Sequence, residues 1–183
     1  MRRFTGPLLC LSLATTASCG DDGADEDRAQ PTTTAPSTTE SQQEQDEREL
    51  RQLAEDWFEA IRDVYVDGAD VTSTADKFLI SPYRNEFLQQ IQEFRASGDE
   101  VRRNADGLTT TEVQSIDVSG DDAVVTECII DADIRVDGDT GEIDDDIEAT
   151  LVRTEAVRHD GDWRLAQTTS LTSIEGQARC ASE

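Results

Sequence analysis

The chain has 183 residues, of which 41 are Asp or Glu and 16 are Lys or Arg, so its formal net charge is -25 at pH 7. Nucleic-acid binding depends on basic patches that neutralise phosphates, and this composition excludes nucleic acid as a partner. The length suits one domain of roughly 100–200 residues with appended segments, which excludes a large multidomain enzyme. A hydrophobic content of 36% still allows one modest core.

The first residues are typical of a secretory signal peptide. Arg2 and Arg3 give a positively charged start, and residues 8–17 form a short, mildly apolar stretch that ends among small side chains. A membrane-spanning helix needs about 20 apolar residues, whereas charge returns here at Asp21. We therefore expect residues 1–18 to be removed on export, by either the general or the twin-arginine route.

The end of this segment carries a lipidation motif. Residues 16–19 (TASC) resemble the lipobox of bacterial lipoproteins, in which small residues precede a cysteine that receives a diacylglyceryl group before cleavage. The resemblance implies that Cys19 becomes the lipidated N-terminus and anchors the protein at the extracytoplasmic face of the cell membrane. Thr16 departs from the usual leucine of the motif, so secretion without lipid is the alternative.

The remaining cysteines favour one disulfide bond. Cys10 leaves with the signal peptide and Cys19 would carry lipid, which leaves Cys128 and Cys180. In an oxidising compartment, a bridge between them would close a long loop, for which the chain-entropy model gives about 4 kcal/mol of stabilisation. The alternative is two buried thiols. No Cys-x-x-Cys spacing and no second histidine support a zinc site.

Residues 19–47 are predicted to be the acylated cysteine followed by a disordered tether. The segment is acidic, rich in Thr, Pro, Ser and Gln, and has no aromatic residue. It therefore cannot bury enough apolar surface to fold. Residues 48–183 are predicted to form a single α+β domain.

The first part of this domain predicts helices. Apolar residues recur at steps of three and four, which places them on one face of an amphipathic helix. This face comprises Leu50, Leu53, Ala54, Trp57, Phe58, Ile61, Val64 and Tyr65. A short second helix is expected over 74–80. In a third helix, Ser81 would cap the start before Pro82, and Gly98 would end the helix.

Beyond the helices the pattern changes to a period of two, which is typical of strands. One nearly apolar face is formed by Val124, Thr126, Cys128, Ile130, Ala132, Ile134 and Val136, which predicts a single long strand with this face toward the core. Asp160-Gly161 provides the turn of a hairpin between strands over 147–158 and 163–172. With a strand around Ile116, the prediction is a four-stranded antiparallel sheet.

Helices packed on one face of a curved antiparallel sheet make an α+β domain. The order of elements, with Trp57 in the first helix, a helix beginning near Pro82 and a closing hairpin with DGDWRL at 160–165, resembles the nuclear transport factor 2-like (SnoaL-like) superfamily. It is similar in particular to secreted actinobacterial lipoproteins of that type. The resemblance implies a cone, in which a bent sheet wraps around helices and the open end often forms an apolar pocket.

The final hairpin and two tyrosines are the candidates for lining such a pocket. The turn predicts that Thr150, Val152, Thr154 and Ala156 lie beside Leu171, Thr169, Gln167 and Leu165 on one face. Hydroxyl and amide groups within an apolar surface suit a small-molecule site, with Tyr65 and Tyr83 as further hydrogen-bond donors. The alternative is a threonine-rich strand face in solvent and tyrosines packed in the core.

The sequence reveals no catalytic set and indicates no cofactor. Enzymes of the superfamily, such as ketosteroid isomerase and scytalone dehydratase, use carboxylate, tyrosine or histidine groups inside the cone, where burial shifts their proton affinity. His159 is the single histidine and adjoins the hairpin turn, so we expect it to be exposed. Asp131 and Asp133 could act as a base only if their strand face lined the cavity, and the apolar face of Cys128 competes for that position.

Acidic residues also crowd the loop over 137–146. With Asp137 and Asp139 at the first and third places of an EF-hand, Glu142 stands where glycine is needed, and no helices flank the loop. A solvated acidic turn is therefore favoured over a calcium site, and no metal site is predicted.

Two functional classes remain. The favoured one is a lipid-anchored, non-catalytic binding or interaction domain at the cell envelope, with a small apolar ligand or an envelope protein as its partner. The alternative is a small-molecule enzyme of the cone fold, similar to an isomerase or dehydratase. The first class needs an anchor, a tether and a recognition surface, whereas the second needs buried titratable groups that the sequence does not reveal.

Overall fold

The computed structural model describes residues 41–105, 109–176 and 180. The signal peptide, the lipidation site Cys19 and most of the predicted tether lie outside these residues. In the described part the elements are α1 (Gln42–Val66), α2 (Val71–Phe78), α3 (Tyr83–Ser97), β1 (Glu100–Arg102), β2 (Thr110–Ser119), β3 (Asp122–Asp131), β4 (Ile134–Val136), β5 (Ile143–Asp144), β6 (Glu148–His159) and β7 (Asp162–Glu175).

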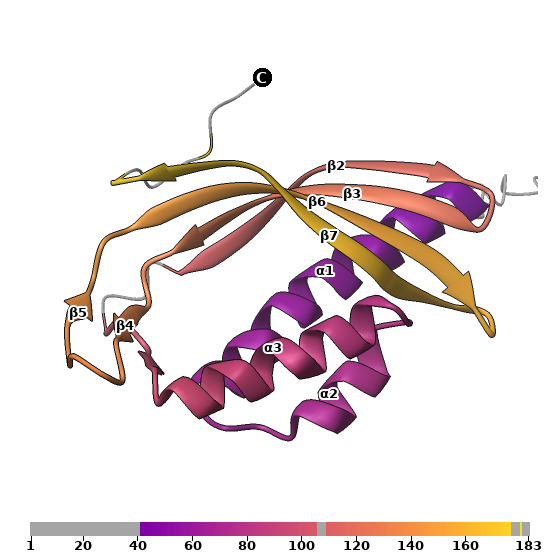
Figure 1. Cartoon of the computed structure of the whole chain (residues 1–183). Coiled ribbons are helices and arrows are strands. Elements are labelled where there is room, and N and C mark those ends of the chain that lie inside the picture. The colour runs from indigo at the N-terminus through magenta and orange to yellow at the C-terminus, as the bar shows by residue number, and fades with distance from the viewer. Residues whose placement is uncertain (1–40, 106–108, 177–179, 181–183) are drawn as a thin grey trace, which may run out of the picture. The chain divides into compact units, whose positions relative to one another are not determined.

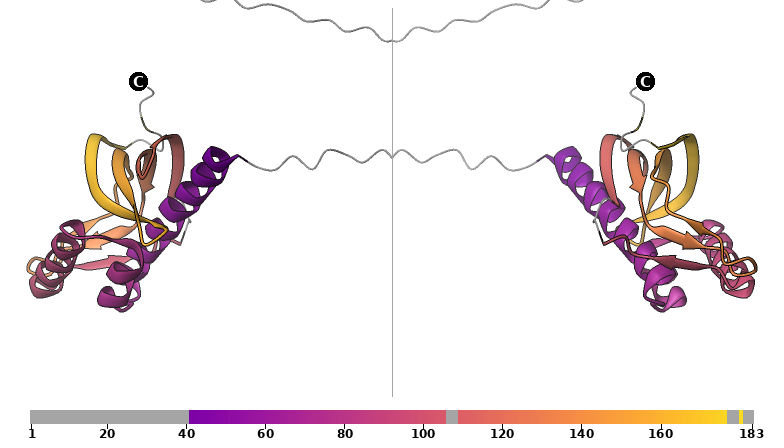
Figure 2. Two further views of the ribbon diagram at one scale, coloured as in Figure 1. Left: turned by 90° about the vertical axis from the view of Figure 1, so that its right-hand side faces the viewer. Right: turned by 90° about the vertical axis from the view of Figure 1, so that its left-hand side faces the viewer.

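The strands form two antiparallel sheets. The main sheet has the order β2-β3-β6-β7, and a small sheet has the order β1-β4-β5. The helices lie on one face of the strongly bent main sheet, with the small sheet beside them (Figure 1). The side views show α1 along the β2 edge of the main sheet (Figure 2). The structure thus confirms the predicted α+β class and the curved four-stranded sheet.

Helix α1 begins at Gln42, so the predicted end of the tether at residue 47 is wrong. Ser41 caps the helix: its hydroxyl accepts from the backbone N–H of Glu44 at 3.2 Å, and its own N–H donates to the Glu44 carboxylate at 2.8 Å. This reciprocal pair satisfies two free N–H groups and starts the helix within an acidic, apolar-poor segment. None of the described helices has the length and apolar composition that crossing a membrane requires.

The other helix ends agree in part with the prediction. Gly98 ends α3 in the left-handed conformation with φ 79°, as expected. Ser81 does not cap α3, because Pro82 occupies the capping position and no side-chain hydrogen bond is made there. Helix α2 begins three residues before the predicted position, at Val71, because the Asp70 side chain accepts from the N–H of Ser73 at 2.7 Å.

The hydrophobic core lies between the helices and the main sheet. Trp57 is at its centre, with ring centroids 5.1 Å from Phe87 and 5.7 Å from Phe78. Val125 of β3 and Leu165 of β7, each 1% exposed, close the core from the sheet side. The apolar stripe predicted for α1 therefore faces the core, and this end of the domain is densely packed.

The predicted long strand is broken at Ala132 and Asp133. β3 ends at Asp131, and the chain continues as β4 of the small sheet, which pairs with β1 and β5. The small sheet was not predicted because its strands are two or three residues long, too short for a period of two to be recognised.

The face of β3 that meets the core is also the reverse of the prediction. Val125 and Glu127 point to the helices, whereas Cys128 lies on the opposite face of the sheet. Cys128 is buried there because the predicted disulfide joins it to Cys180, with the two Cα atoms 5.7 Å apart. Buried residues thus occur on both faces of this strand, so its apolar pattern does not indicate which face is the core.

The β6–β7 hairpin has the predicted turn and the predicted pairing of Ala156 with Leu165, but its register differs further from the turn. Asp160 and Gly161 take positive φ values of 53° and 93°, as a two-residue hairpin turn requires. Two irregularities in β7 then shift the pairing. Thr150, Val152 and Thr154 lie opposite Ser173, Ser170 and Thr168.

Candidate functional site

An open cleft of about 940 Å³ lies between the helices and the two sheets. Its walls come from the last turns of α1 and α3, from β1, β3 and β4, and from the loop that leads through β5. The apolar part of the lining is Phe58, Ile61, Tyr65, Val66, Phe94, Val101, Ile129, Val136 and Ile143. The cleft forms where the chain leaves β3 for the small sheet, so the predicted continuous strand would have closed it.

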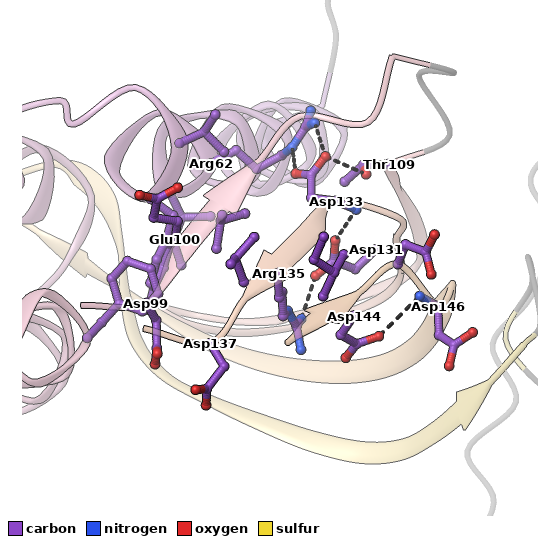
Figure 3. Close-up of a pocket in the computed structure, with 18 of the residues that line it drawn as sticks. Arg62, Asp99, Glu100, Thr109, Asp131, Asp133, Arg135, Asp137, Asp144 and Asp146 are labelled. Carbon is purple, nitrogen blue, oxygen red and sulfur yellow. Dashed lines mark hydrogen bonds and ion pairs between the residues drawn. The ribbon is translucent and has the colours of Figure 1, made fainter. Parts of the chain in front are cut away.

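Asp133 holds one wall of the cleft to helix α1. Its carboxylate accepts two hydrogen bonds from the Arg62 guanidinium, both at 3.0 Å, and a third at 3.0 Å from the Thr109 hydroxyl (Figure 3). Burial raises the pKa of Asp133, but the bonds from Arg62 and Thr109 outweigh it and leave the pKa below its usual value. Asp133 is therefore a charged anchor with its oxygens occupied.

Asp131 and Arg135 form the second ion pair of the cleft. The Arg135 guanidinium lies 2.7 Å from the Asp131 carboxylate and 3.9 Å from that of Glu148. Burial lowers the pKa of Arg135, but these carboxylates outweigh it and raise the pKa above its usual value. Both arginines that line the cleft, Arg62 and Arg135, are thus engaged by acidic side chains.

Most of the other carboxylates of the cleft lie beyond ion-pair distance of any described basic side chain; Glu100 is the exception, since it pairs with Arg102 at 2.7 Å. Among the described residues, no basic side chain forms an ion pair with Asp99, Asp137, Glu142, Asp144, Asp145 or Asp146, all of which line the cleft. Asp137 instead accepts from the backbone N–H and the hydroxyl of Thr140, both at 2.7 Å, and the hydroxyl bond lowers its pKa most. The cleft therefore carries excess negative charge around an apolar floor.

The acidic groups do not converge on one point. Figure 3 shows the carboxylates of Asp99, Asp137 and Asp144 spread around the cleft. Within the described part of the chain, no group of three or more His, Cys, Asp or Glu side chains is placed to hold a metal ion. The acidic side chains of the loop over 137–146 are exposed, and several of them line the rim of the cleft.

Close approach of two loops fixes the mouth of the cleft. A Cβ added to Gly138 would lie 2.4 Å from the backbone carbonyl carbon of Gly98, so only glycine fits there. The Gly138 N–H also donates to the Asp99 carboxylate at 2.8 Å. The end of α3 and the small sheet are thus held together.

Glu127 is a buried carboxyl group on the inner face of β3, opposite to the apolar face that was predicted to meet the core. It is 4% exposed and accepts hydrogen bonds from the hydroxyls of Thr111 at 3.1 Å and Thr154 at 3.2 Å. Burial raises the pKa of Glu127, and these two bonds lower it only in part. Among the described residues, no cation pairs with it.

The neighbours of Glu127 connect it to the rest of the interior. On the same face of β3, Ile129 and Asp131 line the cleft, so Glu127 lies deeper in the cone than the cleft floor. Burial, which dominates, and the nearby charge of Glu127 both raise the pKa of Tyr83. An acidic residue between the apolar Val125 and Ile129 was a sequence signal for a buried carboxyl group. It was missed because the opposite face of β3 was predicted to be the inner one.

The predicted pocket residues fall into three groups. Tyr65 lines the cleft, where its ring lies edge-on to Phe94 at 4.9 Å between centroids. Tyr83 lies against Trp57 at the packed end, and Thr154 is buried beside Glu127. Gln167 and Thr169 are exposed on the opposite face of β7, because of the register shift, so their assignment to the pocket is wrong.

The predicted acid–base candidates are also placed by the structure. Asp131 lines the cleft from the inner face of β3, and Asp133 lines it from the break between β3 and β4, but both are held in ion pairs. His159 is exposed next to the hairpin turn, as predicted.

No protein-family model matches the chain, and no curated protein matches it closely enough to count as a relative. The intermembrane space region of the chloroplast protein ARC6 superposes with a TM-score of 0.57 at 14% identity, over 68% of this chain and 95% of that one. A ketosteroid isomerase-like protein from Erwinia carotovora atroseptica gives a TM-score of 0.48 at 13% identity, over 69% and 97%. At such identities the likeness concerns the fold alone, an α+β domain with helices inside a bent sheet.

Proposed function

We propose that this chain is a lipid-anchored protein of the cell envelope, whose domain binds a ligand in the cleft without transforming it. The proposal rests on the size of the cleft and on the ion pairs that line it. Its volume of about 940 Å³ is at the upper end of small-molecule sites. Its two arginines and the two aspartates best placed for acid–base chemistry are held by one another.

The location rests on the N-terminal sequence. A short apolar segment before Cys19 supports export and acylation, and the Cys128–Cys180 bridge suits an oxidising compartment. With a net charge of -25, the chain has no electrostatic attraction to anionic lipids, so attachment must come from acyl chains. The domain of similar fold in ARC6 is described as an intermembrane space region, which places this fold beside membranes in at least one protein.

The anchor is tested by mass spectrometry of the N-terminal peptide and by cell fractionation. We expect a mature chain that begins at an acylated Cys19 and sediments with membranes, whereas Cys19→Ala leaves the membrane fraction. The control variant Ser18→Ala, which keeps Cys19, should remain in the membrane fraction. Unprocessed protein in the cytosol with Cys128 and Cys180 reduced would contradict the proposal.

A second candidate function is an isomerase- or dehydratase-like enzyme, and Glu127 is the observation that favours it. A buried carboxyl group with a raised pKa, no cation partner among the described residues and a tyrosine nearby has the properties of a general acid or base. The two functions are distinguished by recovering a bound ligand after long incubation with the protein. An unchanged ligand supports binding alone, whereas conversion by the native chain that is lost in Glu127→Gln supports the enzyme.

A further inference from the structure

We propose that the cleft selects an organic cation, an amine or quaternary ammonium group carried on an apolar body. This inference rests on the proposed binding function and adds the chemical class of the ligand. It follows from two features of the cleft, the apolar floor and the excess of acidic side chains at its mouth.

The floor suits an apolar body. Tyr65 and Phe94 form an edge-on aromatic pair on the helix side, and Ile129 and Val136 face the cleft from the two sheets. Aromatic and aliphatic walls of this kind gain free energy by removing hydrocarbon from water, and aromatic faces also attract cations. Among the described large apolar residues, Ile143 is one of the most exposed, at 60%, and it lies at the mouth between Glu142 and Asp144.

The mouth suits a positive charge. Both arginines of the cleft are neutralised by Asp133 and Asp131, so neither is free to receive an anion. Asp144, Asp145 and Asp146 are exposed at the rim, and none of them lies within ion-pair distance of a basic side chain in the described part of the chain. The charge of Asp144 also acts on Arg135, but this one guanidinium already pairs with Asp131 and is outnumbered by the carboxylates. An anionic ligand would meet uncompensated carboxylates, whereas a cation would relieve their mutual repulsion.

The shape favours a small molecule over a peptide. The cleft is bounded by helices on one side and by strands of both sheets on the other sides, and the close contact of Gly138 with Gly98 limits its end. Its volume matches a ligand of small-molecule size. The spread of the carboxylates around the opening also suits a diffuse organic cation better than a metal ion.

The test uses isothermal titration calorimetry on the full chain carrying Cys19→Ala, which lacks the proposed lipid attachment site. The probes share one apolar body and differ in charge: decyltrimethylammonium, decyl maltoside and decanesulfonate, each below its micelle concentration. We expect decyltrimethylammonium to bind at least about tenfold more tightly than decanesulfonate and its affinity to fall as salt is raised, because exposed charges are screened.

Two charge variants separate the rim from general electrostatics. Removing three rim charges in Asp144→Asn/Asp145→Asn/Asp146→Asn should weaken decyltrimethylammonium about fivefold, the size expected for exposed charge pairs. The matched control, Glu55→Gln/Glu112→Gln/Asp117→Asn, removes three exposed charges outside the cleft and should leave the affinity within about twofold.

Three outcomes would overturn the inference. Equal binding of all three probes would mean that the cleft binds apolar bodies without charge selection, which leaves the proposed binding function intact. An equal loss of affinity for decyltrimethylammonium in the two charge variants would mean that the rim carboxylates have no specific role in binding. Binding of an oligolysine peptide but of none of the three probes would replace the small cation with a basic protein partner.

Discussion

The two ends of this domain are built from the same helices, yet only one of them is filled. At the packed end, Trp57 of α1 contacts the rings of Phe78, Tyr83 and Phe87. About two turns further along α1, Tyr65 contacts the ring of Phe94 and lines an open cleft. The main sheet bends away from the helices and β4 departs into the small sheet between these points, so the apolar face of α1 extends beyond the surface that can cover it.

The two ends of helix α1 therefore have different roles. The packed end contributes the free energy of folding, and the open end keeps apolar surface available for a ligand. The Arg62–Asp133 ion pair lies on the open side and connects α1 to the place where β3 ends. Substitutions at each of these places test whether the two ends differ in this way.

The largest effect is expected at the packed end. Trp57→Ala should lower the free energy of unfolding by about 3–5 kcal/mol, because it opens a cavity among three aromatic rings. Phe94→Ala at the open end should cost less than half as much, because its ring already borders solvent in the cleft. Urea unfolding followed by circular dichroism measures both values. Equal losses would show that the two ends are packed alike.

The next effect concerns the Arg62–Asp133 pair. Asp133→Asn should lower the free energy of unfolding by about 3 kcal/mol at pH 7, because it leaves the largely buried Arg62 with only the exposed Glu59, at 3.7 Å, as a counter-charge. Asp131→Asn is the matched control, and it should cost under about 1 kcal/mol because its partner Arg135 is half exposed.

The pH dependence of this variant has a definite sign. The pKa of Asp133 is lowered in the folded state, so its contribution is present above the unfolded pKa and is lost as pH falls through the folded pKa. The difference between the native chain and Asp133→Asn should therefore shrink on acidification below about pH 4, near the ordinary pKa of aspartate. A difference that stays constant to pH 2 would contradict the charged anchor.

The smallest effect is expected at Glu127, between the two ends. Its folded pKa is raised, so its contribution to stability is full below the unfolded pKa and is lost as pH rises through the folded pKa. Glu127→Gln keeps a neutral side chain of the same size beside Thr111 and Thr154. This variant should match the native chain in stability near pH 4 and exceed it increasingly as pH rises, as measured by thermal unfolding. A native chain that gains relative stability with pH would mean that Glu127 has an undetected cation partner.

Local patterns in the sequence determined much of this protein. The apolar stripe of α1, the glycine that ends α3 and the Asp160-Gly161 turn each depend on the backbone preferences of neighbouring residues, and each is found as predicted. The count of cysteines also allowed the Cys128–Cys180 bridge to be expected, since these are the two that follow the predicted signal peptide and lipidation site. The start of α1 could have been predicted as well, because Ser41 and Glu44 have the spacing of a capping box.

Tertiary structure alone decided the inner face of β3, the β6–β7 register and the cleft. Glu127 could point inward only because Thr111 and Thr154, from two other strands, supply hydrogen bonds there, and Cys128 could point outward only because Cys180 covers it. The β6–β7 register depended on two irregularities in β7 that no residue pattern in the sequence predicted. These choices rest on contacts between residues far apart in the chain, so a one-dimensional pattern specifies which residues are apolar or polar but not which of them meet.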